Sequence, residues 1–348
     1  MTPRPKTILH VLAAPGVGLA ARQLALLASD PDGTYVHKVA LLQRDPALAA
    51  YLAAEQLHVF PREQAATSAL LPFAFVAGRW LSELATRTHA DLVQAHDERA
   101  ASVAAPVAQR RGVPFVRTET SADGIDHFLQ RFELKRTRLF VASSEHVRQS
   151  LLRRIPLLAP KMVLAPTALP SPAHVVPLRP NRRGARLRLH LVGVPPHQDG
   201  VVMQALREVA DLVVSHDFAA SAPHGELRDD DTLRHVDAVV AAGTVPLGHD
   251  ADEPVELAVL RAMSHGRPAV VVPGGVFGEL VAGADDGGSC GVIARDGSVA
   301  ALVEAAQRLA SLPLEELGAR ARATFERQHT ADELRSRYRS FYGSVLSG

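Results

Sequence analysis

The residues best placed for chemistry come directly after short apolar segments of the sequence. Gly16 and Gly18 follow the apolar segment 7–14, and His96 lies near the end of DLVQAHD, where an aspartate follows it. Glycine lets a ligand approach the backbone closely, and a histidine beside an aspartate can transfer protons or hold a sugar hydroxyl. Each feature also has a structural explanation, which is a tight turn for the glycines and a hydrogen-bonded histidine at a strand end.

Two further stretches of this kind lie in the second half of the chain. Gly193 and His197 belong to VGVPPHQDG, in which the histidine can contact an anion. Residues 250–263, DADEPVELAVLRAM, are acidic at the start, contain a proline and then follow helical spacing. Acidic residues and proline are typical of a first helical turn. The presence of Glu253 can therefore be explained by helix capping or by ligand binding.

A scaffold must bring these residues together, and the hydrophobic pattern indicates its class. Short apolar segments alternate with helical ones along residues 1–170 and again along 187–330, which predicts two α/β domains with parallel sheets covered on both faces. Residues 171–186 are rich in proline and arginine and form the predicted linker, and residues 331–348 form a predicted C-terminal helix. In such sheets ligands bind at the carboxyl ends of the strands, where the residues above are expected.

Composition excludes several classes of protein. The 348 residues are 47% hydrophobic and include one cysteine, so wholesale disorder, an internal disulfide and a cysteine-based zinc cluster are excluded. No segment reaches the roughly 18 apolar residues of a membrane span, and the N-terminus does not match a signal peptide, so we expect a cytoplasmic chain. The sequence has no Walker A lysine motif, no G-x-S-x-G motif and no basic stripe that would bind nucleic acid.

Charge is distributed unevenly along the chain. Residues 1–175 contain 20 basic and 14 acidic side chains, against 18 and 23 in residues 176–348, although the net charge is only +1. Two solvated surfaces that differ by chance explain this difference. The alternative is an N-terminal half that meets an anionic acceptor, or the inner face of a membrane as a peripheral protein.

The order of these segments resembles that of the GT-B glycosyltransferases, in particular the large retaining family 4. Three N-terminal segments carry part of the resemblance: ILHVLAAPGVGLAARQLALLA, DLVQAHDERAASVAAPVAQRRGVPFVRTE and LFVASSEHVRQSLL. The most specific segment is DAVVAAGTVPLGHDADEPVELAVLRAMSHGRPAVVVPGGVFGELV, which is similar to the donor-site signature of that family. GVIARDGSVAALVEAAQRLAS follows as it does in the family, so the resemblance spans almost the whole chain.

The resemblance implies a GT-B fold, in which two Rossmann-like domains face each other across a cleft and a C-terminal helix crosses back to the N-terminal domain. It implies transfer of a sugar from a nucleotide-sugar donor to an acceptor, with retention and without a metal, in glycan, glycolipid or cell-surface polysaccharide synthesis. The donor is expected mainly on the C-terminal domain, and the unidentified acceptor mainly on the N-terminal one. The nucleotide-sugar is a co-substrate, so no cofactor is expected.

The family motifs assign roles to particular residues of this chain. The predicted catalytic residues are Glu253, His96 and Glu119. The predicted donor-binding residues are Gly16, Gly18, Gly193, His197, Val255, Glu256, Leu257 and Arg261.

The chain departs from the family pattern at these sites. Arg261 stands where the second glutamate of the motif would accept hydrogen bonds from a ribose, and arginine has donors only. Val194 and Asp199 stand where members often carry an arginine and a lysine for the diphosphate. Each such charge is worth on the order of 4 kcal/mol at about 4 Å from a phosphate in a medium of dielectric constant near 20. Glu119 and Thr120 lie where many members have a histidine.

Three hypotheses therefore remain open. The chain is an active glycosyltransferase with a modified donor site, or a catalytically degenerate GT-B protein that acts as partner or scaffold of another glycosyltransferase. The third hypothesis is another GT-B activity, such as that of a nucleotide-sugar epimerase. Nucleotide binding separates the first hypothesis from the second, because a working donor site must recognise the nucleotide.

Overall fold

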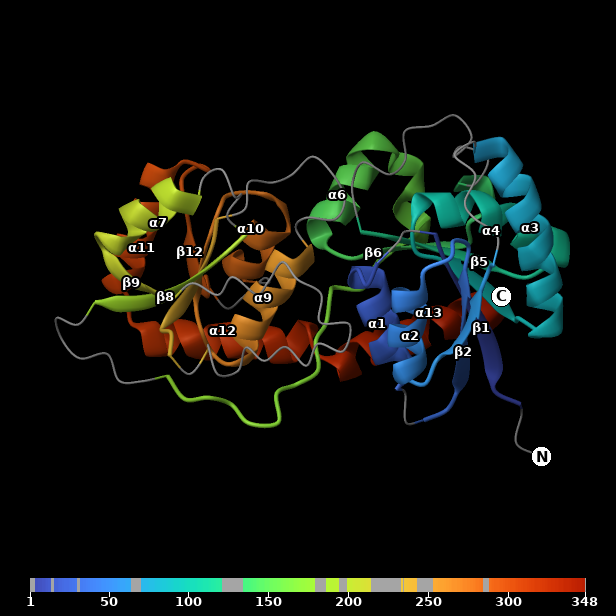
Figure 1. Ribbon diagram of the computed structural model, residues 1–348, viewed down its shortest axis with the longest axis horizontal. Coiled ribbons are helices and arrows are strands. Elements are labelled where there is room, and N and C mark those ends of the chain that lie inside the picture. The colour runs from blue at the N-terminus through green and yellow to red at the C-terminus, as the bar shows by residue number, and fades with distance from the viewer. Residues whose placement is uncertain are drawn as a thin grey trace. The chain divides into compact units, whose positions relative to one another are not determined.

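A computed structural model gives the structure of the chain in two compact units (Figure 1). Unit 1 comprises residues 1–167 and 334–348, and unit 2 comprises residues 168–333. The structure describes residues 4–13, 16–29, 32–63, 70–120, 134–178, 186–193, 199–213, 233, 235–242, 253–283 and 288–347.

Unit 1 is built on a seven-stranded parallel sheet in the order β3-β2-β1-β4-β5-β6-β7. Its strands are β1 (Lys6–Leu12), β2 (Tyr35–Leu41), β3 (His58–Pro61), β4 (Leu92–Ala95), β5 (Phe115–Glu119), β6 (Leu139–Ala142) and β7 (Met162–Leu164). Its helices are α1 (Leu19–Ala28), α2 (Pro46–Ala54), α3 (Leu70–Arg87), α4 (Glu98–Arg111), α6 (Glu145–Arg154), the 3-10 helix η1 (Pro156–Lys161) and most of α13 (Ala331–Ser347). The strand order reverses between β1 and β4, so the switch point at which open α/β sheets bind ligands lies there.

The two faces of this sheet differ in polarity near the switch point. One face carries Leu9, Val11, Val93 and Ala95 and packs against α3 and the alanine-rich α4 in a single apolar core. The other face lies beside α1 and α13 and carries polar side chains from β1, β2 and β4, described below. Figure 1 shows α1 and α3 on opposite sides of the sheet.

The described residues of unit 2 form a five-stranded parallel sheet in the order β12-β11-β10-β8-β9. Its strands are β8 (Leu187–Val192), β9 (Ala210–Val213), β10 (Ala238–Ala241), β11 (Ala269–Val271) and β12 (Gly291–Ile293). Its helices are α7 (Asp199–Arg207), α9 (Glu253–Ser264), α10 (Gly275–Ala282), α11 (Val299–Ala310) and α12 (Leu314–Gln328). The order reverses between β8 and β10, which places a second switch point beside Gly193.

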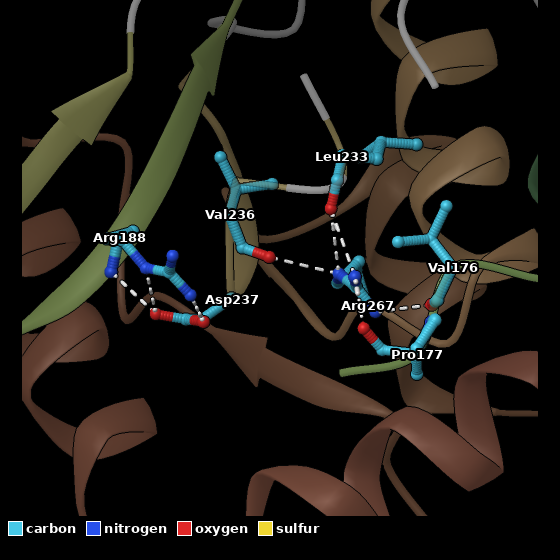
Figure 2. Close-up of polar contacts among 7 residues, drawn as sticks. All are labelled: Val176, Pro177, Arg188, Leu233, Val236, Asp237 and Arg267. Carbon is cyan, nitrogen blue, oxygen red and sulfur yellow. Dashed lines mark hydrogen bonds and ion pairs between the residues drawn. The ribbon is translucent and has the colours of Figure 1, made fainter. Parts of the chain in front are cut away.

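A buried arginine attaches the predicted linker to unit 2 (Figure 2). Arg267 is 1% exposed, and its guanidinium donates to the carbonyl oxygens of Val176 (3.2 Å) and Pro177 (3.1 Å) in the linker and of Leu233 (3.0 Å) and Val236 (3.0 Å) before β10. Burial lowers the pKa of this guanidinium. Carbonyl dipoles from several directions offset the loss of hydration, so Arg267 holds together backbone segments that are far apart in the sequence.

The predicted fold is confirmed as two α/β units with parallel sheets, each with the strand order of a Rossmann-like domain. The structural division falls after Thr167 and again after Glu333, compared with predicted boundaries at 170 and 331. Among the described helices, none has the length and apolar character needed to cross a membrane.

Candidate functional site

The glycine loop after β1 is anchored to α2. Gly16 has a φ of 85°, in the left-handed region that favours glycine, and its N–H donates to Asp45 Oδ2 at 2.6 Å. The other oxygen of Asp45 caps α2 by accepting from the N–H of Leu48 at 2.9 Å. Gly18 precedes α1, whose first turn has no side-chain cap hydrogen bond. The loop thus has a fixed course that ends at a helix N-terminus, the part of a helix that favours anions.

Three buried histidines form a hydrogen-bonded chain across the polar face at the switch point. His10 lies in β1, His37 in β2 and His96 directly after β4, and they are 0%, 8% and 5% exposed. Nδ1 of His10 lies 2.9 Å from Nε2 of His96, and Nε2 of His10 lies 2.8 Å from Nδ1 of His37. The ring centroid of His10 lies 5.1 Å from that of His37 and 5.1 Å from that of His96.

Burial makes the charged form of these rings unfavourable. It lowers the pKa of His10 well below 6.5, and the charges of His37 and His96 lower it further. Burial, and then the charge of His37, lowers the pKa of His96 to about 3. At neutral pH His10 and His96 are therefore neutral imidazoles, each with one donor and one acceptor nitrogen.

Gln94 and two tyrosines of α13 extend the polar face. Gln94 Nε2 donates to Thr118 Oγ1 at 2.7 Å, and Gln94 Oε1 accepts from the hydroxyl of Tyr342 at 2.6 Å. Burial raises the pKa of Tyr342 well above 10, and that of Tyr338 beside it is also raised by burial. Tyr342 is therefore a neutral donor, and both polar atoms of the Gln94 side chain are hydrogen-bonded within unit 1.

The carboxylate next to His96 has a structural role. One oxygen of Asp97 caps α4 by accepting from the N–H of Ala100 at 2.7 Å. The other accepts from the N–H of Ala13 at 2.7 Å, which attaches the end of β1 to the start of α4. Each oxygen of Asp97 therefore holds a backbone N–H group, which joins β1 to α4.

Glu119 lies at the carboxyl end of β5 and is paired with a buried arginine. It is 5% exposed, and its Oε1 forms an ion pair with Nε of Arg117, which is 0% exposed. Gln94 is opposite Val116 in the ladder, so side-chain alternation places Glu119 on the sheet face opposite that of the His96 ring. The structure does not bring these two predicted catalytic side chains into contact.

The predicted donor residues of unit 2 that the structure describes lie after β8 and within α9. Gly193 follows β8 with a φ of 69°, which is in the left-handed region that favours glycine. Val255, Glu256 and Leu257 are buried in the first turns of α9. His197, Val194 and the side chains of Glu253 and Asp199 lie outside the described part of the chain.

Arg261 occupies the last turn of α9, half-buried. It is eight residues after Glu253, which corresponds to about 12 Å along the helix axis. A cation in the last turn of a helix is favourable because it complements the helix dipole. The location of Arg261 therefore has a structural reason that is independent of any ligand.

Sequence reasoning missed the partners of His96. His10, His37, Gln94 and Tyr342 complete the polar face, but each is a single polar residue in an apolar or helical segment. The available signal was a histidine that interrupts an otherwise apolar strand segment in ILHVL, and another inside YVHKV. Which strands become neighbours cannot be read from such segments one at a time.

Comparison with protein families matches residues 18–170 to the description "Glycosyltransferase Family 4". Comparison with curated protein sequences gave no match.

Solved structures with the same fold cover nearly the whole chain. A glycosyltransferase from Rickettsia africae ESF-5 superposes with a TM-score of 0.76 at 14% identity, covering 99% of each chain. The lipopolysaccharide outer core galactosyltransferase WaaB gives 0.71 at 13% identity, covering 97% of this chain and 99% of its own. Anabaena Alr3699/HepE, solved with UDP and glucose, gives 0.68 at 16% identity, covering 97% and 100%. The predicted GT-B fold is confirmed, and the predicted resemblance to family 4 glycosyltransferases is confirmed over residues 18–170.

Proposed function

We propose that this protein, whose residues 18–170 match Glycosyltransferase Family 4, transfers a sugar from a nucleotide-sugar to an acceptor hydroxyl in glycan, glycolipid or polysaccharide synthesis. The observation that carries the proposal is this match within a chain that has the GT-B fold over nearly its full length. The reaction proceeds with retention and without a bound metal, as the resemblance to family 4 implies. UDP-sugars are the first donors to test, since Alr3699/HepE was solved with UDP-glucose.

The donor is held by residues at the strand ends of unit 2. The backbone N–H groups of residues 255–257 and the carboxylate of Glu253 bind its sugar and phosphate at the start of α9. Gly193, with its left-handed backbone, and His197 contact the diphosphate after β8. An N-terminal helical turn supplies oriented N–H groups and a favourable dipole for this task.

His96 and Glu119, two of the three predicted catalytic residues, belong to unit 1. Gly16 and Gly18 leave room for the substrate beside the end of β1. His96, a neutral imidazole, and Glu119, a carboxylate beside Arg117, accept hydrogen bonds from sugar hydroxyls.

Arg261 replaces a hydrogen-bond acceptor by a hydrogen-bond donor and so alters which nucleotide-sugar the protein binds. A guanidinium cannot accept from ribose hydroxyls, but it can bind a phosphate or a carboxylate-bearing sugar. The predicted degenerate alternative, a partner of another glycosyltransferase, is favoured by the same substitution together with Val194 and Asp199. Nucleotide binding decides between the two.

Any membrane contact is peripheral and electrostatic. Exposed Lys135, Arg136 and Arg138 line a cavity of about 440 Å³ in unit 1, at the amino ends of β5 and β6. Such a cluster attracts anionic headgroups on the order of 1 kcal/mol per cation near the surface.

Thermal unfolding in the presence of UDP, GDP, ADP and their sugars tests the donor site. A ligand at 100 times its Kd adds about 2.7 kcal/mol, which raises Tm by roughly 5–10 °C for units of this size. Glu253→Ala should abolish the shift, and the exposed Glu304→Ala on α11 should leave it unchanged. Arg261→Glu should change which nucleotide-sugar gives the largest shift. If no nucleotide raises Tm at millimolar concentration, the active-enzyme proposal is wrong and the scaffold alternative is favoured.

A further inference from the structure

The histidine chain of unit 1 connects its members in a way that fixes their protonation together. Both ring nitrogens of His10 are within hydrogen-bond distance of another histidine, at 2.9 Å from His96 and 2.8 Å from His37. A neutral imidazole has one N–H and one lone pair, so His10 donates to one neighbour and accepts from the other. The orientation of one hydrogen bond therefore determines the other.

Only two arrangements satisfy both hydrogen bonds with neutral rings. In the first, His96 donates from Nε2 to His10, and His10 donates from Nε2 to His37. In the second, His37 donates from Nδ1 to His10, and His10 donates from Nδ1 to His96. The first uses the Nε2–H tautomer in each donor, which is the more stable tautomer of free histidine, and the second uses the less stable Nδ1–H tautomer throughout.

We propose that His10 and His37 are positioning residues that hold His96 in its Nε2–H tautomer, so that its other ring nitrogen, Nδ1, is a hydrogen-bond acceptor for a hydroxyl of the bound sugar. This inference rests on the proposed function for the identity of the ligand. Within the described part of the chain, Nδ1 of His96 has no hydrogen-bond partner, and the ring lies at the switch point where ligands bind.

Two polar groups near the three histidines have hydrogen-bond partners of their own. The Tyr342 hydroxyl, whose ring centroid lies 6.2 Å from that of His37, donates to Gln94 Oε1. The carboxylate of Asp97, the residue after His96, accepts from two backbone N–H groups. The two rings linked to His10 are thus its hydrogen-bond partners within the described residues.

Nitrogen NMR of the protein labelled with 15N-histidine tests the arrangement directly, because it reports which ring nitrogen carries hydrogen. Single histidine substitutions assign the signals. At pH 7.5 we expect His96 and His10 in the Nε2–H tautomer. An Nδ1–H tautomer at His96 in the folded protein would overturn the proposal.

A substitution at His37, the end of the histidine chain away from His96, tests whether the tautomers of the three rings are coupled. His37→Leu removes the acceptor for Nε2 of His10 without touching His96, so the tautomer of His96 should change from a single form to a mixture. Tyr342→Phe removes a nearby hydroxyl that is not part of the histidine chain, and it should leave the His96 signals unchanged. An unchanged His96 tautomer in folded His37→Leu would refute the coupling.

Substitution of the central ring distinguishes hydrogen bonding from packing. Asparagine places an amide oxygen close to the location of Nδ1, so His10→Asn should keep the acceptor for His96, whereas His10→Leu should lose it. With UDP-glucose as the probe, Kd should rise on the order of tenfold in His10→Leu and much less in His10→Asn. Equal losses in both would show a packing role only.

The two proposals fail in distinguishable ways. If UDP-glucose and the other nucleotide-sugars do not bind, the donor proposal fails, and the NMR experiment still decides the tautomer of His96. If they bind but His96 is an Nδ1–H donor, the function stands and the tautomer proposal is wrong.

Discussion

At the scale of single residues, buried polar side chains of this protein are held by specific partners. Arg267 is surrounded by carbonyl oxygens, Arg117 is paired with Glu119, and His10 is held between two other histidines. Burying such groups without partners would cost several kcal/mol each. The histidines differ from the arginines because protonation is disfavoured in the folded state, so they couple stability to pH.

We expect acid to destabilise unit 1 through His10 and His96. Their folded-state pKa values lie well below 6.5 and at about 3, whereas in the unfolded chain both titrate near 6.5. Between these values the unfolded state binds more protons, so the free energy of unfolding falls as pH is lowered from about 6.5 towards 3. The slope should be on the order of 1 kcal/mol per pH unit for each ring.

Urea denaturation between pH 7.5 and 4.5 measures this slope. His96→Gln, which can keep a donor near Nε2 and does not titrate, should reduce the pH dependence by about one histidine. His58→Gln, at the exposed first position of β3, is the matched control and should leave the slope unchanged. Identical slopes for His96→Gln and the wild-type protein would contradict the assignment.

At the scale of elements, the close contact of α9 and α12 depends on glycine. Gly318 in α12 faces the backbone of Gly266, which follows α9 with a φ of 66°. A Cβ at Gly318 would lie 2.3 Å from the carbonyl oxygen of Gly266, and backbone at that location cannot move aside as a flexible side chain can. The helix α9, which carries the predicted donor-binding residues, is therefore positioned by a contact that admits no side chain.

Two glycine-to-alanine changes should have opposite effects on stability. Helix propensity favours alanine by about 1 kcal/mol at either position. In Gly318→Ala the clash outweighs this gain, and we expect a net loss of about 1–3 kcal/mol. Gly343→Ala in α13 meets nothing closer than the Tyr35 hydroxyl at 3.9 Å, so it should stabilise by about 0.5–1 kcal/mol. Chemical denaturation of both variants checks the signs, and a stabilised Gly318→Ala would show that α12 can shift.

At the scale of the whole molecule, the C-terminal segment completes a unit that begins at the N-terminus. Tyr338 and Tyr342 of α13 are buried in unit 1, and Tyr342 binds Gln94 of β4. Nε of Arg335 donates to the carbonyl oxygen of Leu26 at the end of α1, at 2.9 Å. One folding unit is therefore assembled from the two ends of the chain.

Separate expression of the units should show this dependence. Residues 168–333 should unfold cooperatively as an isolated fragment, because unit 2 contains its own sheet and core. Residues 1–167 should expose the polar and aromatic surface that α13 covers and should lack sharp tertiary signals in circular dichroism. Addition of a peptide of residues 331–347 should restore them. A stable, cooperative fragment 1–167 would show that α13 is dispensable.

The amino-acid sequence alone predicts the layers of this protein. Short apolar segments between amphipathic helices have one stable solution, parallel sheets covered on both faces, because each strand must bury both sides. The motif around α9 and the glycine loop were also recognisable, since glycines and acidic residues at helix starts act locally through their own backbone. These features depend on residues that are close in the chain.

Which polar residues come into contact depends on how the strands assemble into the sheet. His10, His37 and His96 are brought into a row by strand order, and Tyr342 reaches Gln94 from the other end of the chain. The same register places Glu119 on the opposite face from His96, although both lie at strand ends in the sequence. The reason is that side-chain alternation and strand order together fix a residue's neighbours, and strand order is a property of the assembled sheet.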